Sequence, residues 1–154
     1  MGGKLSDKAG DLMSVTIWRD GQAVVVSEAE ANLPPVPSPT SDDVNAERQA
    51  RLAAGFDATL SDGVTVIPLQ GRDEDMRNLH GLCTAAQLRM AGGDTTTVTA
   101  FRDRDNVNHD LTPAEVVELW SIGAAWVSAV YAASWAIKDI DPIASDYADD
   151  SRWP

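Results

Sequence analysis

The C-terminal stretch from Thr112 to Ile140 constrains the fold of this chain more than any other segment. Thr112-Pro113-Ala114-Glu115 is a capping box with proline at the first helical position, and it predicts the start of a helix. Asp141-Pro142 predicts the end of this helix near Ile140, because a residue that precedes proline disfavours helical backbone. At about 1.5 Å per residue, such a helix is roughly 40 Å long.

Two neighbouring apolar rows run along this helix at alternating spacings of three and four residues. The first row comprises Val116, Leu119, Gly123, Trp126, Val130, Ala133, Ile137 and Ile140. The second row comprises Val117, Trp120, Ala124, Val127, Tyr131 and Ser134. A coiled-coil seam uses one such row, whereas two adjacent rows form a broad apolar face. We therefore expect a long helix that is largely buried in the core of a globular domain.

A membrane-spanning helix is the alternative interpretation of the same segment. Leu119–Ile137 carries no charged residue, and Trp120 and Trp135 lie near its ends, as in an aromatic belt. The segment is nevertheless rich in alanine, serine and glycine, and only Lys138 follows it, so no basic cluster sets an orientation. The turn signals that precede it are typical of a globular domain, and we expect no membrane association.

Turn and cap signals divide the rest of the chain into short elements. Two further helices are expected, one over residues 41–54 and one from about residue 70 to Gly92-Gly93. Asp-Gly pairs between β-rich runs predict hairpins, because both central turn positions need positive φ. Asp20-Gly21 and Asp62-Gly63 thus predict hairpins over residues 14–26 and 56–69, and a third strand pair over residues 96–111 flanks the charged turn at 102–106. The sequence thus predicts an α+β fold, in which small antiparallel hairpins pack with three helices.

A proline-rich stretch, residues 33–40, separates the first hairpin from everything after it. Its prolines exclude a helix or an interior strand and favour an extended spacer. The predicted organisation follows in chain order. It comprises a flexible leader (1–12), a β-hairpin attachment segment (13–32), a proline-rich linker (33–40), an α+β domain (41–141) and an acidic tail (142–154).

The charge balance of the chain argues against some classes of partner. Acidic residues number 24 and basic residues 12, which gives a formal net charge of -12. Such a surface repels phosphates, so we expect no nucleic-acid partner. It fits simple solubility, or docking to a basic protein partner. The single cysteine excludes an intramolecular disulfide and suits a reducing cytoplasm, or a virion assembled in one.

No combination of residues predicts a catalytic or metal site. His80 and Cys83 lie three residues apart, which offers two ligands and not a complete metal site. Cys83 and His109 would have to act as nucleophile and base, but Cys83 lies among apolar residues, where a thiol is usually buried and inert. The acidic turn over residues 102–106 does not follow the calcium-loop pattern. We therefore expect neither an enzyme nor a cofactor.

Apolar side chains in the hairpin, the linker and the tail are the candidate contacts with partner proteins. The tail is expected to be a solvated acidic end, and aromatic residues in a polar tail are a mild indication of partner binding. The candidate residues are Ile17, Trp18, Val24, Val26, Pro34, Pro35, Pro37, Tyr147 and Trp153.

Several short motifs follow one another in an order that is more specific than any one of them. They are Glu47-Arg48-Gln49-Ala50-Arg51 before Gly55-Phe56, Asp62-Gly63-Val64, Arg72-Asp73 ahead of Asn78, Leu79 and Gly81, and Leu111-Thr112-Pro113-Ala114-Glu115 before an alanine-rich helix. Over residues 45–140 the chain resembles a domain of unknown function found at the C-terminus of tailed-bacteriophage tail-fibre and tail-fibre-assembly proteins. Two steps depart from that pattern. Gln70-Gly71-Arg72-Asp73 replaces a usual Thr-Asp-Arg step, and Phe101-Arg102 stands where lysine or tryptophan is common.

This resemblance implies a bacteriophage virion structural protein, a tail, baseplate or tail-fibre component that acts through protein–protein contacts. The implied partners are other phage tail or fibre proteins, and further copies of the chain in a symmetric homo-oligomer. The implied location is the virion, after assembly in the cytoplasm of the host bacterium. The resemblance carries no catalytic residues. The alternative is a tail-fibre assembly chaperone that is absent from the mature virion.

Overall fold

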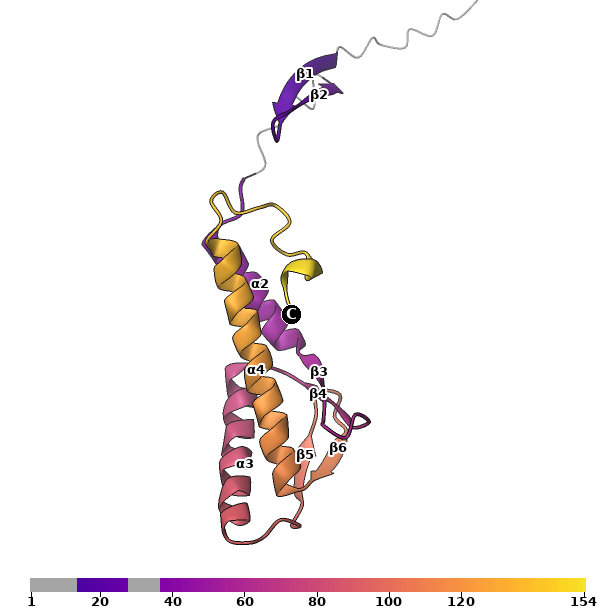
Figure 1. Ribbon diagram of the computed structural model, residues 1–154. Helices are drawn as coiled ribbons and strands as arrows, with labels where there is room; N and C mark the ends of the chain where they lie inside the picture. Colours follow the sequence, from indigo (N-terminus) through magenta and orange to yellow (C-terminus); the bar gives the residue numbers. More distant parts are fainter. Residues whose placement is uncertain (1–13, 28–36) are drawn as a thin grey trace, which may run out of the picture. The chain divides into compact units, whose positions relative to one another are not determined.

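The computed structural model describes residues 14–27 and 37–154 and divides the chain into two compact units after Pro37 (Figure 1). The predicted leader, residues 33–36 of the predicted linker and the ends of the attachment segment lie outside these residues. The fold belongs to the α+β class, as predicted, with three α-helices and three antiparallel strand pairs among the described residues.

The first unit contains one hairpin, formed by β1 (Ser14–Arg19) and β2 (Gln22–Ser27). Its two strands pair in register from Ser14↔Ser27 to Arg19↔Gln22. Asp20 and Gly21 form the turn with φ values of 53° and 77°, which is the backbone that a two-residue hairpin turn requires. The hairpin predicted from the Asp-Gly pair is therefore confirmed.

Three helices form the second unit, and two of them begin with the same device. In α2 (Ser41–Ala54) the Thr40 side chain accepts a hydrogen bond from the N–H of Asp43, and the Asp43 carboxylate accepts one from the N–H of Thr40. Thr112 and Glu115 make the same reciprocal pair at the start of α4 (Pro113–Lys138). These caps fix where the chain enters each helix. The third helix is α3 (Asp73–Ala91).

Two further hairpins complete this unit, and their strands are shorter than the sequence predicts. The pairs are β3 (Phe56–Thr59) with β4 (Val66–Leu69), and β5 (Thr99–Arg102) with β6 (Asn108–Leu111). Asp62 accepts hydrogen bonds from the N–H groups of Val64 and Thr65, so these two residues belong to the turn. Asp94 holds Thr96 and Thr97 in the same way. The side chains of Asp62 and Asp94 thus hold these residues in turns, so β4 and β5 begin later in the sequence than predicted.

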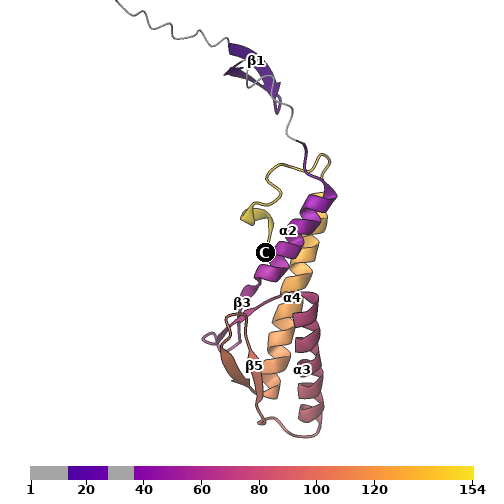
Figure 2. The same ribbon diagram turned by 180° about the vertical axis from the view of Figure 1, so that it is seen from behind.

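Helix α4 runs through the second unit and organises two hydrophobic clusters along its length. Views from opposite sides place it between α3 and the two hairpins (Figures 1 and 2). Its N-terminal half supplies Val116 and Leu119 to a cluster with Leu79 of α3 and Ile67 of β4. We call this the strand-side cluster. Its C-terminal half supplies residues to a second cluster, the tail-side cluster, made by Val44, Leu52, Val130, Ile137 and Trp153.

The burial of α4 differs between the two rows that the sequence shows. Val116, Leu119, Gly123, Val130 and Ile137 of the first row are buried. In the second row only Ser134 is fully buried, and the others are half-buried. The helix is therefore a core helix along one row and a partly exposed surface along the next.

The acidic composition of residues 142–154 predicts a solvated tail, but part of this segment packs against the core. A short 3-10 helix, η1 (Asp150–Arg152), brings Trp153 onto the tail-side cluster, where its side chain is 7 % exposed. The indole N–H donates to the Tyr147 carbonyl at 2.8 Å, and the Arg51 guanidinium lies 5.0 Å from the centre of a Trp153 ring. Asp146 and Asp149 remain exposed. The acidic side chains are therefore solvated, as predicted, whereas Trp153, which was predicted to contact a partner, packs on the core of its own chain.

Candidate partner-binding surfaces

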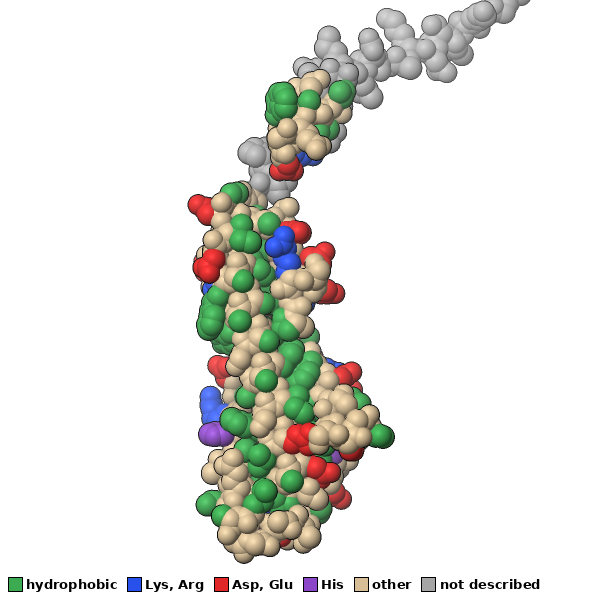
Figure 3. Space-filling view, in the orientation of Figure 1, with side chains coloured by type: hydrophobic (Ala, Val, Ile, Leu, Met, Phe, Trp, Pro, Cys, Tyr) green, Lys and Arg blue, Asp and Glu red, His purple; other side chains and the backbone are tan. Residues whose placement is uncertain are grey.

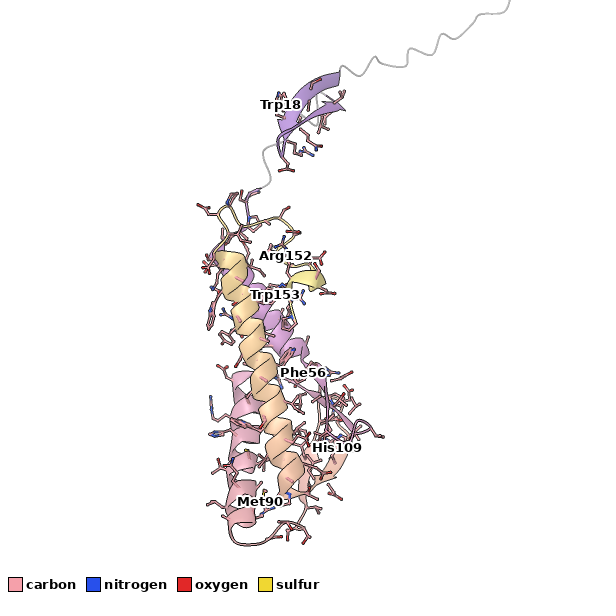
Figure 4. All side chains as sticks on the ribbon, viewed as in Figure 1. Trp18, Phe56, Met90, His109, Arg152 and Trp153 are labelled. Carbon is pink, nitrogen blue, oxygen red and sulfur yellow. The ribbon has the colours of Figure 1, made fainter. Side chains whose placement is uncertain are left out.

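The β1–β2 hairpin places its apolar side chains unequally on its two faces. Side chains alternate along a strand, so Trp18 shares one face with Val25, and Ile17 shares the other with Val24 and Val26. Trp18, which is labelled in Figure 4, is 76 % exposed, and Val25 is 68 % exposed. On the opposite face Val24 is 36 % exposed, Ile17 is half-buried and Val26 is buried. The exposed face, which we call the Trp18 face, is the stronger candidate for a contact surface.

The backbone of this hairpin offers a second means of contact. The sheet contains two strands in the described part of the chain, so each strand has one unpaired edge. Proteins usually protect such edges with lysine, proline or a bulge. Neither strand contains lysine or proline, and the pairing from Ser14 to Ser27 has no bulge. Within the described residues, both edges therefore offer unpaired backbone groups of the kind that strand addition uses.

The remaining candidate residues divide into exposed, buried and undescribed ones. Pro37 is exposed, whereas Pro34 and Pro35 lie outside the described residues. Tyr147 is half-buried and packs on the tail-side cluster beside Trp153. Trp153 and Val26 are covered within the chain itself, so neither offers an exposed contact. The described candidates thus belong to two separate units, the β1–β2 hairpin with Pro37 and the tail of the second unit.

Helix α4 carries an exposed surface that the sequence analysis did not single out. Its exposed positions include Ser121, Ala125, Ser128, Ala132 and Trp135, which recur at spacings of four and three residues. We call this set the outer row. Trp135 is 56 % exposed and lies edge-on to Tyr131. Figure 3 shows a mainly hydrophobic and neutral surface along this helix, with charged side chains toward the edges of the body. The signal was present in the sequence as a third row of spaced small residues.

The length and composition of α4 also satisfy the test for a membrane-spanning helix, as do those of many core helices in soluble proteins. It is the one such helix in the portions that the structure describes. Its inner row packs against α2 and α3, whose other faces carry Asp, Glu and Arg side chains. Placing α4 in a bilayer would bring those charges into hydrocarbon. The interpretation as a core helix is therefore favoured.

Residues 36–151 match the family model described as Domain of unknown function (DUF4376). The chain belongs to this family. The match spans α2, α3, α4 and both hairpins of the second unit, and begins after β1 and β2. No curated protein and no solved structure matches the chain.

In the DUF4376 domain the residues with catalytic potential are separated from one another. Cys83 in α3 is 1 % exposed. Burial raises the pKa of its thiol, which disfavours the reactive thiolate. His80 is exposed and packs against Trp120, with ring centres 5.3 Å apart. Within the described ranges, no group of three or more metal-ligating side chains comes together.

The remaining histidine, His109, lies in β6 (labelled in Figure 4) and contacts the turn between β5 and β6. Its Nε2 lies 2.8 Å from Oδ2 of Asp103, whose Oδ1 accepts the N–H groups of Asp105 and Val107, each at 2.8 Å. Burial by itself would raise the pKa of the Asp103 carboxyl. The hydrogen bonds from His109, Val107 and Asp105 outweigh burial and hold this pKa below its ordinary value. The pair therefore clamps the turn between β5 and β6.

Proposed function

We propose that this DUF4376 chain is a structural component of a bacteriophage virion, located in the tail, baseplate or tail fibre. It acts by binding other tail or fibre proteins, not by catalysis. The link with phage tails rests on the resemblance of residues 45–140 to a domain of tail-fibre and tail-fibre-assembly proteins. The observation that carries the binding role is the β1–β2 hairpin, which exposes Trp18 and Val25 and whose outer strand edges have no partner strand within residues 14–27 and 37–154.

The hairpin is suited to completion by strands of a partner protein. An isolated two-stranded hairpin is marginally stable in water, and a third strand with an apolar face supplies what it lacks. A partner strand added to either edge gains backbone hydrogen bonds, while the Trp18 face gains burial. Trp is also among the residues that contribute most at protein interfaces. In this proposal residues 14–27 attach the chain to its partner, and the DUF4376 domain is the part of the chain that this attachment holds in the assembly.

Self-association into a symmetric assembly is the second part of the proposal. A chain with a net charge of -12 repels its own copies over most of its surface. The outer row of α4 is uncharged, so two copies can approach there without that repulsion. Small side chains at Ser121, Ala125, Ser128 and Ala132 permit close approach of helices.

Mass spectrometry of purified virions of the phage that encodes this chain tests the proposal. Abundant peptides from the chain are expected in the particle. In a phage that carries Trp18→Asp with Val25→Asp, the particle should lose the chain, because two charges on the Trp18 face cannot be buried without partners. Val64→Asp is the matched control, since Val64 is 83 % exposed at a turn outside the attachment segment.

A tail-fibre assembly chaperone is the competing function, and the same measurement separates the two. Absence of the chain from mature particles, combined with loss of fibres when its gene is deleted, would favour the chaperone. Wild-type amounts of the Trp18→Asp, Val25→Asp variant in the particle would show that the hairpin is not the attachment segment.

A further inference from the structure

A pocket of about 330 Å³ opens in the DUF4376 domain between the end of β4, the first half of α3 and the turn after β5. Its size lies at the small end of the range of roughly 300–1,000 Å³ that is typical of ligand sites. Leu69, Leu79, Leu82 and Phe101 provide apolar wall, and the first two are buried in the strand-side cluster. Arginines from three positions surround this apolar part.

Two of these arginines are already paired with carboxylates. Arg72 Nε lies 2.6 Å from Oδ2 of Asp75, one turn further along α3. Arg104 donates to Asp57 at 3.0 Å and to the Ala54 carbonyl at 3.1 Å, which ties the turn to β3. Both guanidinium groups therefore have a structural role.

The third, Arg102, has no carboxylate partner among residues 14–27 and 37–154. Its Nε donates to Oδ1 of Asn106 at 3.2 Å, which leaves the two terminal nitrogens for another acceptor. Asn106 lies in the turn after β5 with φ 66°, and its amide oxygen orients Arg102. In a chain of net charge -12, an oriented arginine beside an apolar pocket is a specific recognition element for an anion.

The other charges in the pocket wall restrict what this anion can be. Asp75 and Asp103 both line the pocket, and both accept hydrogen bonds within the domain. A dianionic phosphate would meet the repulsion of two carboxylates, whereas a single carboxylate meets half of it and matches the planar guanidinium. A sugar would place hydroxyl groups against leucine side chains that cannot hydrogen-bond them.

We propose that this pocket binds an acidic peptide segment of a partner protein. One carboxylate of the peptide pairs with Arg102, and a neighbouring apolar side chain enters between Leu79, Leu82 and Phe101. Asn78 lies at the same wall and offers an amide to the peptide backbone. The inference concerns residues 68–106 and is independent of the attachment role of the hairpin.

Titration of the full chain with a short acetylated and amidated peptide containing Leu-Glu-Leu, followed by 15N NMR, tests this assignment. Saturable shifts are expected at the pocket residues, including the Arg102 Nε–H signal. Arg102→Gln should weaken binding about tenfold or more, since it removes a charged hydrogen-bonding partner. Arg102→Lys should recover only part of the loss, because lysine cannot form the bidentate pair. Arg77→Gln, on the exposed part of α3 and outside the pocket, should leave the affinity unchanged.

A peptide containing Leu-Gln-Leu distinguishes the outcomes, and so do two small anions. Equal binding of the Gln and Glu peptides would overturn the assignment, and so would shifts centred outside the pocket or the absence of saturable shifts at millimolar peptide. Tighter binding of galacturonic acid or inorganic phosphate at Arg102 would overturn the peptide assignment in favour of that ligand. Arg102 is exposed, and an unchanged NMR spectrum away from residue 102 establishes that its variants remain folded.

Discussion

The hairpin unit and the DUF4376 domain treat their apolar side chains in opposite ways. In residues 14–27, Trp18 and Val25 are exposed, and of the side chains described there Val26 is buried. In residues 38–154, α4 closes one cluster with α3 and the hairpins and another with α2 and the tail. The difference indicates that the domain supplies its own core, whereas the hairpin leaves one apolar face exposed.

The largest expected effect would come from a side chain inserted at Gly55, where the domain is closed most tightly. Gly55 has φ 76°, and a Cβ placed there would lie 1.8 Å from the Leu69 carbonyl oxygen. Gly55→Ala should therefore destabilise the domain by roughly 3 kcal/mol or more in a denaturant titration. Gly63 has φ 70° with open space around it, so Gly63→Ala carries the backbone strain alone and should cost about 1 kcal/mol. Equal losses would mean that the junction of α2 and β3 is not closed as described.

Removal of the Trp153 ring tests whether the tail belongs to the self-sufficient core. Trp153→Ala should lower the free energy of unfolding by about 3 kcal/mol, because it leaves a cavity in the tail-side cluster and removes the ring under Arg51. Trp135→Ala removes the same side chain from an exposed position on α4 and should cost far less. Calorimetry of both variants makes the comparison. A harmless Trp153→Ala would place the tail outside the core.

A smaller effect is expected from acid, through the clamp in the turn between β5 and β6. Because the pKa of Asp103 is held below its ordinary value in the folded domain, its ionised form stabilises the fold above about pH 4. That contribution is lost as the pH falls through the lowered pKa. Melting temperatures measured from pH 6 to pH 2 should fall less steeply for Asp103→Asn, which starts from a lower stability at pH 6. Asp110→Asn, an exposed neighbour in β6, should keep the wild-type slope.

The smallest effect is expected for the hairpin. Trp18→Asp with Val25→Asp should leave the thermal unfolding of the DUF4376 domain unchanged, because neither side chain contributes to either of its clusters. Differential scanning calorimetry of the full chain measures this directly. A clear drop in the melting temperature of the domain would break the division between the hairpin and an independent domain.

Local signals predicted most of the elements, and they failed where a contact joins distant segments. Neighbouring residues alone determine the geometry of the capping boxes at Thr40 and Thr112 and of the turn at Asp20-Gly21. The sequence could therefore predict these features. The docking of Trp153 depends on Val44 and Val130, which lie far away in sequence. No local sequence pattern distinguishes an aromatic residue that packs on the core of its own chain from one that binds a partner protein.

The same limit applies to the candidate sites. The sequence identified Trp18, Val24 and Val26 as candidate contacts. It did not predict that Val25, instead of Val26, joins Trp18 on the exposed face, since that depends on the register across the turn. The pocket beside Arg102 arises only when β4, α3 and the turn after β5 meet. The sequence alone does not show which arginines lack a carboxylate partner.

Helix α4 has a mechanical consequence. Its 26 residues form a rod of roughly 39 Å, and one cluster is fastened to each half of that rod. A pulling force applied along its axis would load both clusters in shear at the same time, instead of peeling contacts apart one after another. A domain built in this way is expected to yield abruptly at a high force, as a single stiff link between whatever is attached at its two ends.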